Sequence, residues 1–568
     1  MKKRDICFII LIFIIILIVS LFIYKTINKE NTNIVGSKTN IENIDSTINL
    51  DNGDEKIDWE ALDSSNLVLN GESVSITREG TYNLTGSIKN GSVIIDTEGD
   101  VKLVLNNITI SNSSAPCIIV LNANNTVIES KEGTINSFEG GDNYANEEYD
   151  GVIYSKDDLI FQGTGTLNIN SNYKDGIVSN DDLKIISGTY VINAKDDAIR
   201  GKDSVYIKAG NFDITAAGDG IKATNDSDSS KGFINIEGGI FNIIVSNDGI
   251  QAETKLIISG GTFNIKTGDG ATSKGSARNK MFGDNSTYDS ESTKGLKSGD
   301  NLVVTGGVFD INAKDDAIHS NNYVGIKNAI IDISSGDDGI HADKELVIDS
   351  GTITINSSYE GLESNNITIN NGKINVTASD DGINISGGAD SSSMNRPGAN
   401  FDAVSTGTLT INNGEITVNS SGDGLDSNGN IVMNGGTVYV NGPTANGNGA
   451  LDYNGTFVVN GGTIIAVGSS GMAQSTSATS KNYSLMFNLS KTYNGKIRLV
   501  DNKNNVVLEF TPIKSYQNVV LSSERILKGE TYTLKINDET IESLTASVVN
   551  TSNSREGNIG GGHMGGRR

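Results

Sequence analysis

A chain of 568 residues with 66 Gly, 4 Pro and 1 Trp favours short strands joined by many tight turns and argues against long helices. Its formal net charge of −25 excludes nucleic acid and anionic lipid surfaces as direct partners, because both would be repelled. An anionic partner would therefore need a bridging cation.

The N-terminal segment, residues 1–27, carries a Lys/Arg cluster and then an apolar run from Ile6 to Tyr24 without any charged residue. This run is long enough to span a bilayer, and the basic cluster would stay in the cytoplasm and place the rest of the chain outside. Because no small-residue cleavage site follows, we expect an uncleaved single-pass anchor that displays the protein at the cell surface. A cleaved signal peptide, which would give a secreted protein, is the alternative. Residues 28–57 are polar and aperiodic, which is typical of a linker.

Internal repeats follow the linker. The octapeptide Ile192–Ile199 recurs unchanged as Ile311–Ile318, and it belongs to a degenerate motif of an acid, Gly or Ala, and an aliphatic residue. Successive acids of this motif, such as Asp316, Asp338 and Glu360, stand 22 residues apart. A unit of this length without a helical pattern cannot bury its apolar face alone, so successive units must stack.

The repeats predict an all-β fold, a single-stranded parallel β-helix with one rung per repeat. Residues 58–143 would form an N-terminal cap and the first rungs, 144–468 the Asp-rich rungs, 469–549 a small C-terminal β cap or domain, and 550–568 a disordered Gly-rich tail. A leucine-rich repeat would need Leu at fixed offsets and a helical segment, and a calcium β-roll has a much shorter period. Neither pattern is present.

Stacking would turn equivalent positions into ladders with a spacing of about 4.8 Å. One interior ladder would contain Ile177, Ile199, Ile221, Ile250, Leu296, Ile318, Ile340, Leu362, Ile383 and Leu425. A second would contain Tyr190, Phe212, Phe241, Phe263 and Phe309 and continue as Ile331, Ile353, Ile374 and Ile416.

The acids of the motif would form a ladder of their own. Four rungs carry doublets, namely Asp196-Asp197, Asp315-Asp316, Asp337-Asp338 and Asp380-Asp381. Stacked carboxylates repel by about 1 kcal/mol per neighbouring pair in water and by more at low dielectric, so the ladder favours a bound cation. Ca²⁺ suits it because it accepts six to eight hard oxygen ligands in flexible geometry. Lys294 replaces the acid on one rung, where its ammonium would act as a tethered cation. The alternative is a row of solvated Asp turns.

A polar residue follows each aliphatic residue of the motif, and strand alternation predicts that it points outward. This column contains Arg200, Lys222, Gln251, Lys297, His319, His341, Glu363, Asn384 and Asp426. We take Arg200, Lys222, Lys297, His319 and His341 as candidate ligand-binding residues. His319 and His341 lack a third nitrogen or sulfur ligand at suitable spacing, so stacked surface imidazoles are favoured over a zinc site.

From about Trp59 to the C-terminus, the Asp-Asp-Gly/Ala-Ile rungs, the Gly-Gly-Thr-Phe-x-Ile strands and the glycine-rich Arg-Arg end resemble the clostridial-type cell-surface carbohydrate-binding β-helix proteins. That resemblance implies a right-handed, pectate-lyase-type coil, bound calcium, and binding of cellulose or polygalacturonate without catalysis. The implied calcium ligands are Asp175, Asp196, Asp197, Asp219, Asp248, Asp315, Asp316, Asp337, Asp338, Asp380 and Asp381. Lys294 departs from the acidic pattern and leaves the number of ions near it open.

The first functional hypothesis is a monomeric binding protein that holds cell-wall polysaccharide through calcium, with the membrane contacted only by the N-terminal segment and no catalytic residue assigned. The second is a calcium-dependent pectate lyase, in which a basic residue removes the uronate α-proton. Its candidate bases are Lys195, Arg200, Lys222, Lys294 and Lys314. Each has a simpler role as a counter-charge to a nearby Asp. The third is a structural surface adhesin.

Overall fold

The computed structural model describes residues 40–48, 56–271, 292–385 and 407–553. The chain divides into two compact units, 1–39 and 40–568, and the predicted anchor lies in the first unit, outside the described residues. Most of the predicted C-terminal tail also lies outside them. Among the described residues, no helix has the length and apolar character needed to cross a membrane.

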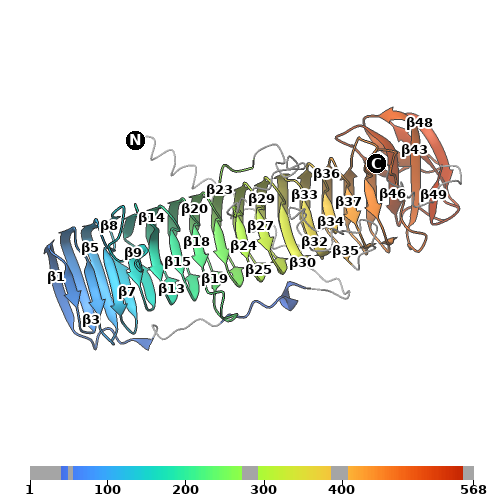
Figure 1. The fold of residues 1–568 in the computed structure, drawn as a ribbon. Coiled ribbons are helices and arrows are strands. Elements are labelled where there is room, and N and C mark those ends of the chain that lie inside the picture. Colours follow the sequence, from blue (N-terminus) through green and yellow to red (C-terminus); the bar gives the residue numbers. More distant parts are fainter. Residues whose placement is uncertain (1–39, 49–55, 272–291, 386–406, 554–568) are drawn as a thin grey trace, which may run out of the picture. The chain divides into compact units, whose positions relative to one another are not determined.

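The predicted all-β fold with a large parallel sheet is confirmed. One sheet contains 45 strands and a second contains four, and a short 3-10 turn, η1 (Ile41–Asn43), precedes them in the chain. The strands of the large sheet follow one another in chain order along a coil (Figure 1). The chain enters this coil through β1 (Ser64–Gly71), β2 (Val74–Ile76), β3 (Gly80–Lys89), β4 (Val93–Asp96), β5 (Val101–Asn112), β6 (Ile118–Asn122), β7 (Thr126–Ser130) and β8 (Ile135–Gly140).

After β8 each turn of the coil adds one strand to each of three parallel stacks, because every strand pairs with the equivalent strand of the next turn. Stack A contains β9 (Gly151–Ser155), β12 (Asp175–Ser179), β15 (Ile199–Gly201), β18 (Ile221–Ala223), β21 (Ile250–Ala252), β24 (Leu296–Ser298), β27 (Ile318–Ser320), β30 (Ile340–Ile348), β32 (Leu362–Ile369), β34 (Ile383–Ile385), β37 (Leu425–Ser427) and β40 (Leu451–Tyr453).

Stack B receives the second half of β30 and of β32. Its other members are β10 (Leu159–Gly163), β13 (Asp182–Ile185), β16 (Ser204–Ile207), β19 (Phe233–Ile236), β22 (Lys255–Ile258), β25 (Asn301–Val304), β28 (Tyr323–Ile326), β35 (Thr408–Ile411), β38 (Asn430–Met433) and β41 (Phe457–Val459). Stack C contains β11 (Thr166–Asn170), β14 (Thr189–Ala194), β17 (Asn211–Ala216), β20 (Ile240–Val245), β23 (Thr262–Thr267), β26 (Val308–Ala313), β29 (Ala329–Ser335), β31 (Gly351–Ser357), β33 (Lys373–Ala378), β36 (Glu415–Ser420), β39 (Thr437–Asn441) and β42 (Thr463–Gly468).

The register of the stacks places like side chains on top of one another. Ile177 is the Cα partner of Ile199, and Ile199 of Ile221, so 22 residues separate equivalent positions there. All members of the predicted aliphatic ladder are fully buried. The rings of the second ladder stack from Phe212 to Phe309 with centroids 4.6 Å apart and planes within 2° of parallel. Burial and ring stacking therefore come from the same parallel register.

Parallel stacking ends at β42, which pairs antiparallel with β46 (Tyr516–Ser523). β46 pairs in turn with β43 (Tyr483–Tyr493), and β43 pairs with β49 (Asn550–Ser552). The four-stranded sheet consists of β44 (Ile497–Val500), β45 (Val506–Phe510), β47 (Thr531–Ile536) and β48 (Glu539–Thr545). These strands enclose a second apolar core that is separate from the core of the coil.

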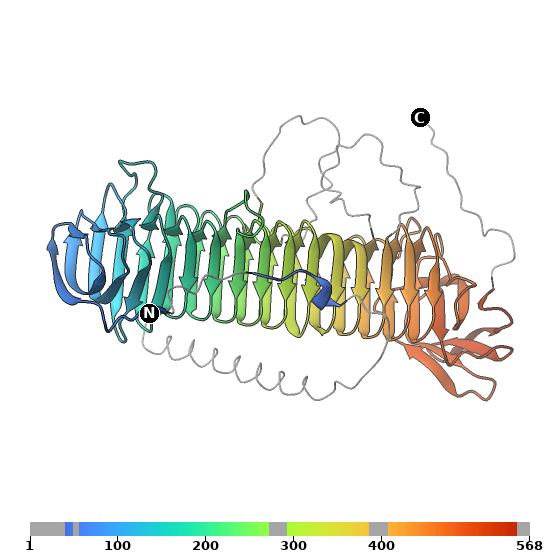
Figure 2. The same cartoon turned by 90° about the horizontal axis from the view of Figure 1, so that it is seen from below.

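Part of the predicted linker packs against the coil. Ile41 and Ile44 are buried against Val303 and Val347, and η1 lies beside the rungs of stack B (Figure 2). Gly325 makes room for them, because a Cβ atom there would lie 2.6 Å from Ile41 and 2.7 Å from Ile44. The described part of this linker therefore belongs to the folded unit.

Replacing Ile318 with Asp should destabilise the coil by about 4 kcal/mol or more, because it buries an unpaired charge in the middle of the aliphatic ladder. Ile244 on β20 is 46% exposed, and Ile244→Asp is the matched control, with an expected change within about 0.5 kcal/mol. Denaturant unfolding followed by circular dichroism measures both. Equal stability of the two variants would contradict the interior position of Ile318.

Candidate functional site

Two columns of polar side chains run along one edge of stack A. The acid column lies at the start of the strands or just before them and contains Asp175, Asp197, Asp219, Asp248, Lys294, Asp316, Asp338, Glu360, Asp381 and Asp423. The polar column lies three residues further along the chain and contains Arg200, Lys222, Gln251, Lys297, His319, His341, Glu363, Asn384, Asp426 and Asp452. Successive members of the polar column are Cα partners on adjacent rungs.

The carboxylates of the acid column hold successive rungs together. The backbone N–H of Asp197 donates to Asp175 Oδ1 at 3.1 Å, and that of Asp219 donates to Asp197 Oδ1 at 2.8 Å. The same bond joins further rungs, from Asp248 N to Asp219, from Lys294 N to Asp248, from Asp338 N to Asp316, from Glu360 N to Asp338 and from Asp423 N to Asp381. One oxygen of each of these Asp carboxylates therefore satisfies a backbone donor, and the other oxygen is available to a cation.

Several members of the polar column are less exposed than its predicted outward direction implies. His319, His341, Glu363 and Asn384 are buried, and His341 is 0% exposed. The reason is the rung spacing, because planar side chains stacked at this distance cover one another. The rings of His319 and His341 lie 4.9 Å apart and stack within 11° of parallel, but they are not at the surface.

Basic side chains neutralise the first part of the acid column. Arg200 donates to Asp150 and, at 2.7 Å, to Asp175. Lys222 Nζ lies 2.7 Å from Asp219 Oδ2 and 3.4 Å from Asp197 Oδ2. Lys297 Nζ reaches back one rung to Asp248 Oδ2 at 2.9 Å. Three tethered cations thus serve five carboxylates between Asp150 and Asp248.

Lys294 and the two imidazoles neutralise the middle of the column. Lys294 Nζ lies 2.9 Å from Asp315 Oδ2 and 2.6 Å from Asp316 Oδ2, so it acts as the tethered cation that its position predicted. Burial alone would raise the pKa of Asp316, but the Lys294 ammonium and the His319 imidazole outweigh burial and hold that pKa below its usual range.

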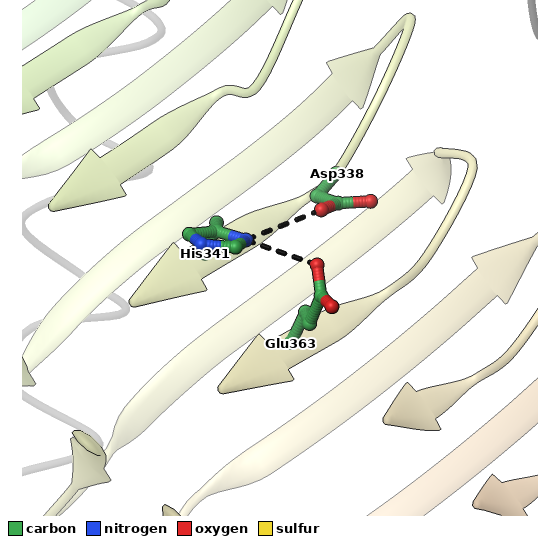
Figure 3. Close-up of side chains that lie close together, drawn as sticks. All are labelled: Asp338, His341 and Glu363. Atoms are coloured by element: carbon green, nitrogen blue, oxygen red, sulfur yellow. Dashed lines mark hydrogen bonds and ion pairs between the residues drawn. The ribbon is translucent and has the colours of Figure 1, made fainter. Parts of the chain in front are cut away.

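One rung further, His341 Nδ1 faces Asp338 and Glu363 (Figure 3). Its Nε2 lies 3.0 Å from Asp343 Oδ1. Burial alone would lower the pKa of His341, but its contacts with Asp338, Asp343 and Glu363 raise it above its usual value. The imidazole therefore carries a proton that the surrounding carboxylates share.

The candidate bases for a lyase are poorly suited to that role. Burial would lower the pKa values of Lys222 and Lys294, but the neighbouring carboxylates raise both above the usual range. Burial would lower the pKa of Arg200 too, but Asp175 and Asp150 raise it above its usual value. Such groups stay protonated at neutral pH, whereas a general base must be unprotonated. The other two candidate bases, Lys195 and Lys314, are exposed to solvent.

The last part of the two columns lacks tethered cations. Asp381, Asp423 and Asp426 bring carboxylate oxygens within 4.8 Å of one another. No Lys, Arg or His side chain of the described segments forms an ion pair with them. Burial and then Asp426 raise the pKa of Asp381 to about 8. Burial raises the pKa of Asp423 to about 6, and burial together with Asp423 raises that of Asp426 to about 7. A site of this kind repels a second negative charge and attracts a cation.

The structure brings the predicted calcium ligands together only in part. Asp175, Asp196 and Asp197 form one group of closely spaced carboxylates, and so do Asp315, Asp316 and Asp337. In each of these groups the buried Asp pairs with a basic side chain of the columns. Asp219 and Asp248 contact Lys222 and Lys297 instead of each other's carboxylates. Asp338 joins His341 and Glu363, and Asp381 joins two residues outside the predicted set, with Asp380 close enough to raise its pKa.

The residues missed by the sequence prediction are Asp423 and Asp426. Both stand in the repeat, Asp423 in the acid column and Asp426 in the polar column. The signal that could have identified them is the absence of Lys, Arg and His from both columns after His341. Asn384, in the polar column between Glu363 and Asp426, adds a buried Oδ1 atom without a hydrogen-bond partner.

Known proteins and a protein family share sequence with this chain. A family model described as carbohydrate-binding domain-containing protein matches residues 70–339 and 338–554. A protein of Acetivibrio thermocellus with the same description is 31% identical over 120 residues, which are 20% of this chain and 41% of that protein, so the match spans less than half of the relative. The solved structure of a polysaccharide lyase-like protein from C. thermocellum, a gadolinium derivative, is 29% identical with a TM-score of 0.35, covering 36% of this chain and 91% of that chain. The family match extends over both polar columns.

Replacing Lys222 with Met should destabilise the protein by about 3 kcal/mol at neutral pH, because Asp197 and Asp219 lose their shared cation. The loss should shrink at acidic pH, where protonation of the two carboxyl groups removes their repulsion. Lys373→Met is the matched control, because Lys373 and its partner Glu415 are 58% and 57% exposed, and its effect should stay within about 0.5 kcal/mol. Urea unfolding at neutral and at acidic pH measures the loss of stability in each variant. A loss that does not depend on pH would show that Lys222 acts through packing alone.

Proposed function

Because this chain belongs to the family of carbohydrate-binding domain-containing proteins, we propose that it binds an anionic cell-wall polysaccharide through calcium held by Asp381, Asp423 and Asp426. Family membership supports the polysaccharide as the ligand. The observation that carries the choice of site is the stretch of clustered carboxylates without a tethered cation. The acid column from Asp175 to Asp338 already has basic side chains as counter-charges.

The donor set of this stretch suits calcium. Asp381, Asp423 and Asp426 supply carboxylate oxygens, and the Asn384 Oδ1 atom is a buried acceptor without a partner. These are hard oxygen donors without nitrogen or sulfur, which is the preference of Ca²⁺. Magnesium is less suitable because it demands near-ideal octahedral geometry and gives up its water reluctantly.

A bound divalent ion would supply positive charge for a uronate carboxylate of the polysaccharide. The formal net charge of −25 would otherwise repel such a polymer. The site residues are partly exposed, in contrast to Asp316 and Asp338. Polygalacturonate is therefore the favoured ligand, and cellulose, which has no charge for calcium to bridge, is the second candidate.

The proposal includes the type of coil, the caps at its two ends and the anchor at the cell surface. The coil is a right-handed β-helix of the clostridial-type surface proteins with about 22 residues per rung, a spacing that the partners Ile177, Ile199 and Ile221 support. Residues 58–143 and 469–549 close its two ends. The protein is a monomer held at the cell surface by residues 1–27, which places the site outside the cell.

Retention of the protein on immobilised polygalacturonate tests the function. We expect retention in calcium and release by a chelator, without any unsaturated uronide detected by ultraviolet absorbance. Formation of such a product would identify a lyase instead. Absence of both retention and product would leave the adhesin hypothesis.

The variant Asp381→Asn/Asp426→Asn should lose most of the calcium-induced rise in the unfolding temperature and most of the retention on polygalacturonate. An ion that binds only the folded state stabilises it by mass action, and these changes remove two of its ligands. Asp197→Asn/Asp219→Asn is the matched control, because it removes two charges from acids that Lys222 already neutralises. Differential scanning calorimetry with and without calcium measures the difference. If the control variant loses as much of the calcium response as the test variant, calcium does not bind at Asp381.

The calcium-induced rise in unfolding temperature should grow between about pH 5 and about pH 8. The pKa values of Asp381 and Asp426 are raised to about 8 and about 7 in the folded protein, above the unfolded value near 3.9. Without metal, the folded state binds more protons than the unfolded state in this range, so the free energy of unfolding falls as pH rises. Calcium competes with those protons and restores the lost stability. A calcium effect of constant size across this range would contradict the assignment.

A further inference from the structure

The cluster Asp338, His341 and Glu363 combines one nitrogen and two oxygen donors at the centre of the columns. His341 Nδ1 lies 3.4 Å from Asp338 Oδ2 and 3.0 Å from Glu363 Oε2 (Figure 3). All three donor atoms fall within 4.8 Å of one another, and all three residues are buried. The three side chains come from two adjacent rungs and converge on one point between β30 and β32.

We propose that Asp338, His341 and Glu363 form a second metal site, separate from the calcium centre, for a divalent transition ion such as Zn²⁺. The ion takes the position between the three donor atoms and displaces the proton from His341 Nδ1 to solvent. The bonds formed are one metal–nitrogen bond and two metal–oxygen bonds, and water or a further side-chain oxygen completes the shell.

Two of the three donor–donor distances in the cluster match those of a coordination shell. Zinc binds imidazole nitrogen and carboxylate oxygen at about 2.0–2.2 Å, so neighbouring ligand atoms of a tetrahedral shell stand about 3.3 Å apart. The two contacts of His341 Nδ1, at 3.0 and 3.4 Å, bracket this value. The imidazole of His341 therefore already lies at ligand-to-ligand distance from both carboxylates.

The surroundings hold the three donors in place. His341 Nε2 lies 3.0 Å from Asp343 Oδ1, and a carboxylate on the far nitrogen fixes the imidazole tautomer that leaves Nδ1 for a metal. Asp338 Oδ1 accepts the backbone N–H of Glu360 at 3.2 Å, which leaves Oδ2 toward the cluster. The stacked ring of His319 restricts rotation of the His341 ring.

The donor chemistry separates this site from the calcium centre. An imidazole nitrogen is a favourable ligand for zinc, nickel and copper, whereas calcium prefers oxygen. The neighbouring group of Asp315, Asp316 and Asp337 cannot serve in the same way, because Lys294 Nζ lies 2.6 Å from Asp316 Oδ2. His319 on that rung is thus the natural control for His341.

The test uses the full chain without an affinity tag, produced in zinc-supplemented medium and passed through gel filtration. We expect about one zinc per chain in the unmodified protein by inductively coupled plasma mass spectrometry, and a loss of at least tenfold in His341→Gln and in Glu363→Gln. The controls His319→Gln and Asp381→Asn/Asp426→Asn should keep their zinc. Protein produced with Co²⁺ should show the visible d–d bands of a nitrogen- and oxygen-bound ion, and the two test variants should not.

Glu363→Gln keeps the size of the side chain, so it remains informative if His341→Gln does not fold. Zinc in that variant at the level of the unmodified protein, or no zinc in the unmodified protein, would overturn the proposal. The calcium-induced rise in unfolding temperature should be unchanged in Glu363→Gln. If this rise persists in Glu363→Gln while zinc is lost, the two metal sites are independent, and either proposal can fail without the other.

Discussion

Parallel stacking of rungs at the inter-strand distance places each side chain over its equivalent on the rung before, and the rest of this structure depends on that constraint. For apolar residues the repetition is favourable. The Phe rings from Phe212 to Phe309 stack at 4.6 Å, and the aliphatic ladder of stack A is fully buried. For ionised residues the same repetition sets like charges side by side in a partly dry environment, where repulsion is strong. A coil that repeats an acid on every rung must therefore supply counter-charge along its length.

The acid column supplies it in different ways along the coil. The backbone N–H of each following rung neutralises part of the charge on nearly every acid, as in the bond from Asp219 N to Asp197 Oδ1. Arg200, Lys222, Lys297 and Lys294 add full positive charges where the repeat permits a long basic side chain. Beyond His341 the described columns contain carboxylates without such partners, and the pKa values of Asp381 and Asp426 rise accordingly. We therefore place the proposed cation and its anionic ligand at this stretch of the coil.

The change in donor type along the columns also separates two kinds of ion. The stretch around Asp381 offers only oxygen, which suits a large hard cation exchanging with water and sugar carboxylates. The cluster around His341 is buried and includes nitrogen, which suits a smaller ion held within the fold. The two metal sites that we propose would thus place ions of different chemistry on neighbouring rungs of the same coil.

The sequence by itself determined the all-β class, the stacking of repeats and the content of both interior ladders, because each depends on a local period that the chain repeats many times. It also indicated the acid column and the role of Lys294. The motif gave the rung order even across two insertions, since Ile250 pairs with Leu296, 46 residues later, and Ile383 with Leu425, 42 residues later. It could not determine which charges meet, because the order of the rungs does not say which neighbouring rung a long side chain reaches. Contacts such as Lys297 with Asp248, Glu363 with His341, and Asp426 with Asp381 join adjacent rungs, and whether such side chains face solvent or one another depends on how the rungs stack. Only the tertiary structure decided which of these side chains are buried. The burial of His341, for example, arises from neighbours on other rungs rather than from the alternation of its own strand.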